Sequence, residues 1–262
     1  MAYTFEQSKA LFQRAAKVIP QGIYGHFNPS TTIPGSYPYF IAKAKGPRFW
    51  DVDGNEYIDY SCAYGPMILG YAHDRVDEAF AVQARKGTAT MPPSTLLIDL
   101  AEKMVEVNDC ADWAVFAKNG ADTTCWALVL ARGYRRRNKI VLSHGGYHGT
   151  HDFAEINITA SAELETRPPL RKESQGIPDC ILDAMMVVPF NDLDAVEETL
   201  TAYNHRIAAV IVEPMMNAGG LVASRPGYLS GLRELADKYG VLLIFDEIVT
   251  FRLSLGGWQL LN

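Results

Sequence analysis

The sequence lacks the features that mark several classes of protein. Only four cysteines occur in 262 residues, with no C-x-x-C pair, which disfavours a disulfide framework or a zinc site and favours reduced thiols in the cytoplasm. The net charge of −6 disfavours a surface for nucleic acid or an anionic membrane. No apolar run approaches membrane-spanning length, and residues 1–6 show no signal-peptide pattern. An ordinary globular protein remains, long enough for one large domain or two smaller ones.

The sequence does contain a regular alternation of helix and strand patterns. Helices are predicted at residues 5–19, 74–86, 95–107, 123–134, 191–203 and 226–239, and strands at 39–42, 47–52, 57–60, 112–118, 139–143, 184–188, 207–212 and 241–245. The alternation predicts an α/β fold with a doubly wound, mostly parallel sheet and helices on both faces. We expect a helix and short antiparallel strands in residues 1–60, and one large domain in residues 61–262.

Three details of this prediction concern single elements. The apolar helix 123–134 is expected to be buried, and Asn191 is expected to cap the helix that follows it. The uninterrupted apolar run 241–245 predicts a fully buried strand that delivers Asp246 and Glu247 to the rim of the sheet. A buried carboxylate is costly without a partner, so Asp246 either faces a cation or leaves the strand for solvent.

Two loops at strand ends carry further candidates. Residues 119–122, NGAD, stand between a strand and a helix, where small residues and a helix N-terminus suit a phosphate; a plain turn is the alternative. Residues 144–151, HGGYHGTH, hold three histidines, His144, His148 and His151, without metalloprotease spacing. Tyr147 in this loop either stacks on a flat ligand or fills a gap against the core. A metal-dependent hydrolase built on the three histidines is a further interpretation of this loop.

These motifs, taken together and in order, resemble the class III aminotransferases, and most closely their glutamate-1-semialdehyde aminomutase branch. The matching segments are PRFWDVDGNEYIDY (47–60), GP (65–66), NGAD (119–122), GYHG (146–149), VEP (212–214), PGYLSGLR (226–233), FDEIVT (245–250) and LGG (255–257). The resemblance covers nearly the whole chain. It implies the type I fold of enzymes that use pyridoxal 5'-phosphate, and the transfer of an amino group as a transaminase or an aminomutase.

The resemblance also implies roles for single residues. Backbone groups of Gly120 and Ala121 would bind the cofactor phosphate, Tyr147 and Ile248 would pack on the two faces of its ring, Asp246 would pair with the ring nitrogen, and His148 and Glu213 would support these contacts. Asn28 falls where the aminomutases carry a carboxylate-binding arginine, so it is a candidate substrate residue. No metal ligand is implied.

The family's catalytic lysine, which bonds to the cofactor aldehyde, would lie beyond Asn262, so no catalytic residue is assigned. We therefore expect a C-terminally truncated member of the family, with an incomplete sheet, no small C-terminal domain and little or no transaminase activity alone. The family implies an amine or amino acid and a carbonyl compound as substrates, and a homodimer. The alternative is a non-catalytic homologue that binds pyridoxal phosphate or a partner subunit.

Overall fold

The computed structural model describes residues 3–23, 40–88, 90–159 and 168–261. The chain forms two compact units, Met1–Pro93 (unit 1) and Ser94–Asn262 (unit 2). The division proposed at residue 60 stays a prediction, but residues 61–93 group with unit 1. The reason is that Gly46 and Tyr71 exchange two backbone hydrogen bonds of 2.9 Å, while the Tyr71 hydroxyl donates to Asp59.

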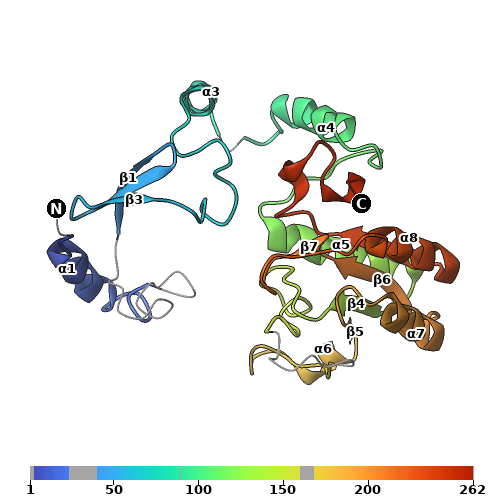
Figure 1. Cartoon of the computed structure of the whole chain (residues 1–262). Helices are drawn as coiled ribbons and strands as arrows, with labels where there is room; N and C mark the ends of the chain where they lie inside the picture. The colour runs from blue at the N-terminus through green and yellow to red at the C-terminus, as the bar shows by residue number, and fades with distance from the viewer. Residues whose placement is uncertain (1–2, 24–39, 89, 160–167, 262) are drawn as a thin grey trace. The chain divides into compact units, whose positions relative to one another are not determined.

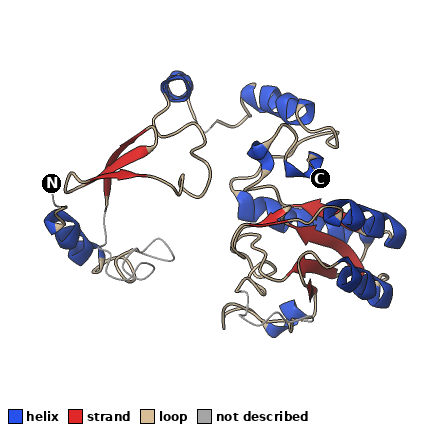
Figure 2. Cartoon of the chain, in the orientation of Figure 1, coloured by secondary structure: helices blue, strands red, loops and turns tan. Residues whose placement is uncertain are grey.

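The part of unit 1 that the structure describes contains a small antiparallel sheet and two helices (Figures 1 and 2). Its elements are α1 (Glu6–Ala15), β1 (Ile41–Lys45), β2 (Arg48–Asp51), β3 (Glu56–Ile58) and α3 (Asp74–Ala84), with strand order β1-β2-β3. The predicted hairpin turn is confirmed. Asp51 Oδ1 accepts from the backbone N–H groups of Asp53 and Asn55, and Gly54 supplies a positive φ of 85°.

Unit 2 is built on a parallel sheet of four strands, β4 (Lys139–Ser143), β5 (Met185–Val188), β6 (Ile207–Val212) and β9 (Leu242–Phe245). Their order is β5-β4-β6-β9. The chain leaves β4 toward β5 and then returns to the other side of β4 for β6 and β9. The winding direction therefore reverses between β4 and β6, and ligands of open α/β sheets bind outside the carboxyl ends of strands at such a point.

Helices cover both faces of this sheet, as predicted (Figure 1). Alternate residues of β4 point to opposite faces: Val141 joins one core, whereas Ile140 and Leu142 join the other. The first core includes residues of α7 (Leu193–Tyr203) and α8 (Tyr228–Tyr239). The second includes residues of α5 (Gly120–Arg135) and borders α6 (Asp179–Leu182). Unit 2 also contains α4 (Leu96–Glu106), the hairpin β7 (Met215–Met216) and β8 (Val222–Ala223), and the short helices η2 (Phe251–Leu253) and η3 (Trp258–Leu260).

Four details of the prediction are wrong. Residues 112–118 form no strand, because no described segment pairs with them. Only one face of α5 is buried, at Thr124, Leu128 and Ala131, because a helix packs a single face on a sheet. Strand β9 is partly exposed rather than fully buried, because it lies at the edge of the described sheet.

The fourth correction concerns the start of α7. Asp192, not Asn191, caps this helix, and its carboxylate accepts from Ala195 N at 2.9 Å. Asn191 has a φ of 63° and uses its side chain differently, accepting from Arg225 N and donating to Ala223 O. The helix cap therefore lies one residue later than predicted. The side-chain hydrogen bonds of Asn191 link the loop after β5 to the segment before α8.

Candidate functional site

The N-terminus of α5 is arranged as an anion site. Asn119 caps the helix, and its side-chain oxygen accepts from Asp122 N at 2.9 Å. The first N–H groups of a helix have no partner within it, and the helix dipole favours negative charge there. Gly120 leaves room for the side chain of Ile248, because a Cβ on Gly120 would lie 2.9 Å from Ile248 Cδ1. The predicted turn 119–122 thus lies beside the loop that follows Asp246.

The loop after β4 is tied to the end of β6. The backbone N–H of Tyr147 donates to Glu213 Oε2 at 2.9 Å. A side chain at Gly146 would crowd the loop, since its Cβ would lie 3.1 Å from Ser143 O and 3.3 Å from His148 Nε2. Tyr147 itself is 40% exposed, so its ring is available at the surface of unit 2 rather than filling the core.

Asp246 and His148 form a buried pair at the carboxyl edge of the sheet. His148 Nδ1 and Asp246 Oδ2 are 2.8 Å apart, and both side chains are almost completely buried. Asp246 Oδ1 also accepts from Ile248 N at 3.2 Å. Asp246 therefore does not leave the strand for solvent, and its side-chain partner among the described residues is the imidazole of His148. Its second ring nitrogen, Nε2, is buried and has no hydrogen-bond partner among the described residues.

Glu213 is a second buried carboxylate at this edge. Burial raises its pKa, and Asp246 raises it further, while the Tyr147 N–H and His148 act in the opposite direction. Its other oxygen accepts from Asn217 N at 3.4 Å. Glu213 thus joins the loops that follow β4 and β6.

Thr124 and Gly149 join the same loop to α5, and no sequence pattern had indicated a role for Thr124. Thr124 Oγ1 lies 2.6 Å from His148 O and 3.2 Å from His151 Nε2. Gly149 has a φ of 103°, and a Cβ there would lie 2.7 Å from Ala121 Cα. Burial lowers the pKa of His151. These contacts join residues about 25 positions apart, so no local sequence pattern predicts them.

Glu247 organises the segment after Asp246. Its carboxylate accepts from the Thr250 hydroxyl, from Trp258 N at 3.0 Å and from Gln259 N at 2.9 Å. The two neighbouring acids therefore have different roles. Asp246 faces His148, whereas Glu247 folds residues 250–259 back beside it.

The remaining predicted residues are placed as follows. The Ile248 side chain is 68% exposed next to Gly120. Asn28 lies outside the described residues. Within the described part of the chain, no group of three or more His, Cys, Asp or Glu side chains is arranged to hold a metal ion, and His148 and His151 bond to Asp246 and Thr124 instead. The roles of these residues toward a cofactor stay predictions.

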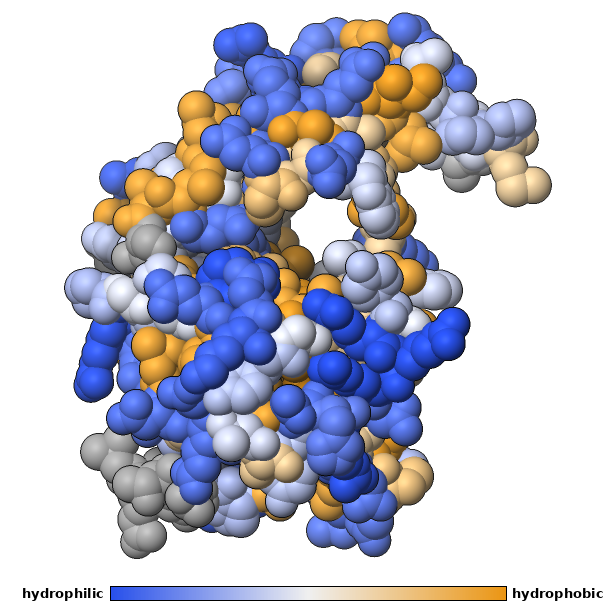
Figure 3. All heavy atoms as spheres, turned by 90° about the vertical axis from the view of Figure 1, so that its right-hand side faces the viewer, coloured by the Kyte–Doolittle hydropathy of each residue, from blue (hydrophilic) through white to orange (hydrophobic). Residues whose placement is uncertain are grey.

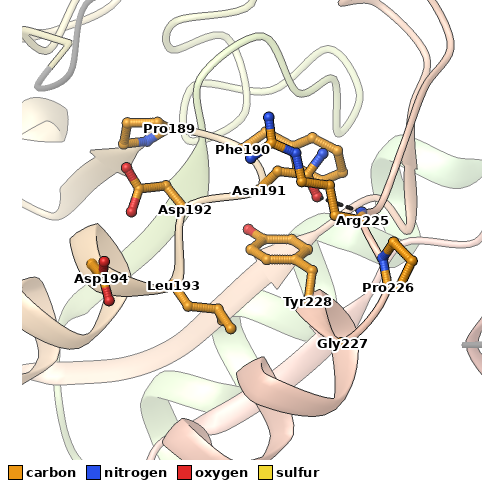
Figure 4. Close-up of a pocket in the computed structure, with 10 residues that line it drawn as sticks. All are labelled: Pro189, Phe190, Asn191, Asp192, Leu193, Asp194, Arg225, Pro226, Gly227 and Tyr228. Carbon is orange, nitrogen blue, oxygen red and sulfur yellow. Dashed lines mark hydrogen bonds between the residues drawn. The ribbon is translucent and has the colours of Figure 1, made fainter.

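A pocket of about 580 Å³ lies elsewhere in unit 2, between the segment after β5 and the segment leading into α8. Figure 4 shows its lining, including Phe190, Tyr228 and the hydrogen bond from Arg225 N to Asn191. Burial raises the pKa of Tyr228 to about 12. The lining contains none of the predicted cofactor residues. The predicted cofactor residues lie instead at the edge that carries Asp246, which is therefore the better candidate site.

Comparisons with known proteins bear on the family to which the chain belongs. The family model described as aminotransferase class-III matches residues 32–252. A glutamate-1-semialdehyde 2,1-aminomutase from Desulforamulus reducens is 40% identical over 260 residues, which are 99% of this chain and 59% of that protein. The described helices contain none long and apolar enough to cross a membrane.

Solved structures give the same result for the fold. An omega-transaminase from Sphaerobacter thermophilus matches with a TM-score of 0.89 and 32% identity, covering 97% of this chain and 57% of that one. A transaminase with PLP bound matches with a TM-score of 0.90 and 30% identity, over 100% of this chain and 60% of that one. The chain thus spans less than two thirds of the length of these relatives. Over that length, the chain belongs to the class III aminotransferase family.

Proposed function

We propose that this chain carries the pyridoxal 5'-phosphate site of an enzyme that moves an amino group, as an aminotransferase or an aminomutase. One observation carries the proposal: the buried Asp246–His148 pair lies at the same sheet edge as the capped N-terminus of α5. Ile248 connects the two, since it follows Asp246 and packs on Gly120. A ligand with an anionic end and a protonated ring nitrogen suits such an arrangement.

The residues present fit this cofactor. The small residues Gly120 and Ala121 leave backbone N–H groups open to a phosphate, and Tyr147 and Ile248 offer partly exposed side chains to a ring. When bound, pyridoxal phosphate supplies an electron-withdrawing ring that stabilises negative charge on the substrate. The Asp246 carboxylate would hold a proton on the ring nitrogen, because an adjacent negative charge favours the charged form of a base. His148 fixes the orientation of that carboxylate through its 2.8 Å contact.

This chain matches 59% of the length of the aminomutase relative. We propose an amine or amino acid and a carbonyl compound as substrates, and a second copy of the chain as partner. Four cysteines without a disulfide support a reducing compartment such as the cytoplasm.

Cofactor titration tests the proposal. Pyridoxal phosphate should change the absorbance and induce circular dichroism in the cofactor band, and it should bind more tightly than pyridoxal, which lacks the phosphate. Asp246→Asn should raise the Kd roughly 10- to 100-fold, as expected for the loss of a hydrogen bond between charged groups. Asp237→Asn, in an exposed pair with Arg233 on α8, is the matched control. A wild-type chain without any response would overturn the proposal.

A non-catalytic role as a binding subunit is the second candidate. It is favoured by apolar side chains left exposed on α4, namely Leu96, Leu97, Ile98 and Leu100. Figure 3 views the molecule from the right-hand side of Figure 1. It shows hydrophobic side chains toward the top, at the height where Figure 1 draws α4. Borohydride reduction with bound cofactor, followed by peptide mass spectrometry, separates the candidates. A cofactor fixed to a lysine of this chain, together with amino transfer, would support the catalytic one.

A further inference from the structure

Thr124 has an unusual surrounding for a threonine near the N-terminus of a helix. Threonine hydroxyls in helices commonly bond back to a carbonyl of the preceding turn, and Thr124 Oγ1 does lie 3.0 Å from Gly120 O and 3.1 Å from Ala121 O. Its shortest contact is a different one, 2.6 Å to the backbone oxygen of His148, and this contact is buried. The hydroxyl has a single proton, so the geometry assigns that proton to His148 O.

The second partner of the hydroxyl completes the arrangement. With its proton given to His148 O, Thr124 Oγ1 accepts from the His151 Nε2–H at 3.2 Å. This contact requires a proton on His151 Nε2, and burial lowers the pKa of His151, which favours the neutral tautomer that carries its proton there. Thr124 therefore contacts the loop at both His148 and His151.

Residues 147–149 are held by contacts with both the sheet and helix α5. Glu213 and Asp246 attach the loop to the sheet, through Tyr147 N and His148 Nδ1. Thr124 and the close approach of Gly149 to Ala121 attach it to α5. Of the two contacts with α5, the Thr124 hydroxyl gives the directional, polar one. It ties the helix that would bind the phosphate to the histidine that orients Asp246.

We propose that Thr124 is a positioning residue for the cofactor site, fixing the N-terminus of α5 relative to the Asp246–His148 pair. This inference rests on the proposed function, but the hydrogen bond from the Thr124 hydroxyl to His148 O, which we call the tether, is present in the chain without cofactor. Removing the hydroxyl frees the loop to move on α5. The N-terminus of α5, which would bind the phosphate, and Asp246, which would pair with the ring nitrogen, are then no longer held in a fixed arrangement.

Thr124→Val tests the tether, because valine keeps the shape and loses the hydroxyl, whereas Thr124→Ser keeps the hydroxyl. Thr199→Val is the matched control, since the Thr199 hydroxyl on α7 donates back to Ala195 O at 2.8 Å, within its own helix. In the chain without cofactor, hydrogen exchange at the Gly146 and Tyr147 amides should quicken about tenfold in Thr124→Val, in proportion to one lost hydrogen bond. Thr124→Ser and Thr199→Val should match the wild type there.

With pyridoxal phosphate, the Kd of Thr124→Val should rise about tenfold and the induced circular dichroism should weaken, with both restored in Thr124→Ser. Thr124→Ala is measured in the same way if the valine variant does not fold. Unchanged exchange in Thr124→Val, or equal effects in Thr199→Val, would overturn the inference. If the wild type binds no cofactor, the proposed function fails, while the exchange measurement still decides whether Thr124 holds the loop.

Discussion

Asp246 and Glu213 show how two carboxylates at one sheet edge acquire different chemistry from their surroundings. Asp246 faces an imidazole at 2.8 Å and a backbone N–H, so its negative charge has partners on both oxygens. Glu213 accepts only from backbone N–H groups and lies near the charge of Asp246, and its pKa is raised. Glu213 therefore supports the loop at a cost that depends on pH.

The pH dependence of stability tests this interpretation of Glu213. A carboxyl whose pKa is raised on folding stabilises the protein below its usual value near 4.5, and that contribution is lost as the pH rises through the raised pKa. Glu213→Gln is neutral at every pH and should escape this loss. Its free energy of unfolding relative to wild type should therefore increase as the pH rises from about 4.5 toward 8.

Urea unfolding at a series of pH values measures the difference. Glu234→Gln, an exposed position on α8, is the control and should follow the wild-type curve. A parallel course of Glu213→Gln and wild type across this range would contradict a raised pKa at Glu213.

At the scale of elements, two glycines with unlike surroundings lie where α5 meets the loops that follow β4 and β9. A Cβ at Gly149 would meet the backbone of Ala121 at 2.7 Å, and the residue has a φ of 103°, which L side chains rarely adopt. A Cβ at Gly120 would meet only the far end of the Ile248 side chain, which is exposed and can move.

Gly149→Ala should therefore lower the free energy of unfolding by about 2–4 kcal/mol, from backbone strain and overpacking together. Gly120→Ala should change it by less than about 1 kcal/mol, because alanine has the better helix propensity and Ile248 can rotate away. Denaturant unfolding of the pair gives both numbers. Equal costs in the two variants would mean that the loop does not press on α5 as described.

The elements also show how far sequence reasoning reaches. Strands β4 and β6 were predicted at their observed bounds, because buried strands give uninterrupted apolar runs. Residues 112–118 share that pattern but form no strand, since a strand also requires a neighbour to pair with. The Asp246–His148 pairing was not predicted from spacing, because it joins residues 98 positions apart. Local patterns place chemical groups at the edge of a sheet, and only the packing shows which of them meet.

At the scale of the whole molecule, unit 2 buries a core on each face of its sheet and yet leaves one side of α5 apolar. Trp126 and Leu130 are four residues apart on this helix, and they are 62% and 57% exposed. Monomeric proteins rarely expose such a surface without a partner that covers it. A second copy of the chain is the partner that the proposed function favours.

Sedimentation velocity tests this self-association. Wild-type chain should sediment faster as its concentration rises, because the apolar face of α5 drives pairing. The double substitution Trp126→Glu and Leu130→Glu should abolish that concentration dependence, since charge on this face would have to be desolvated in a dimer. Tyr203→Glu, at an exposed aromatic residue that ends α7, should leave it unchanged. Circular dichroism should show equal helix content in all variants. A wild type that remains monomeric at every concentration, or a double variant that associates equally well, would remove α5 as the contact.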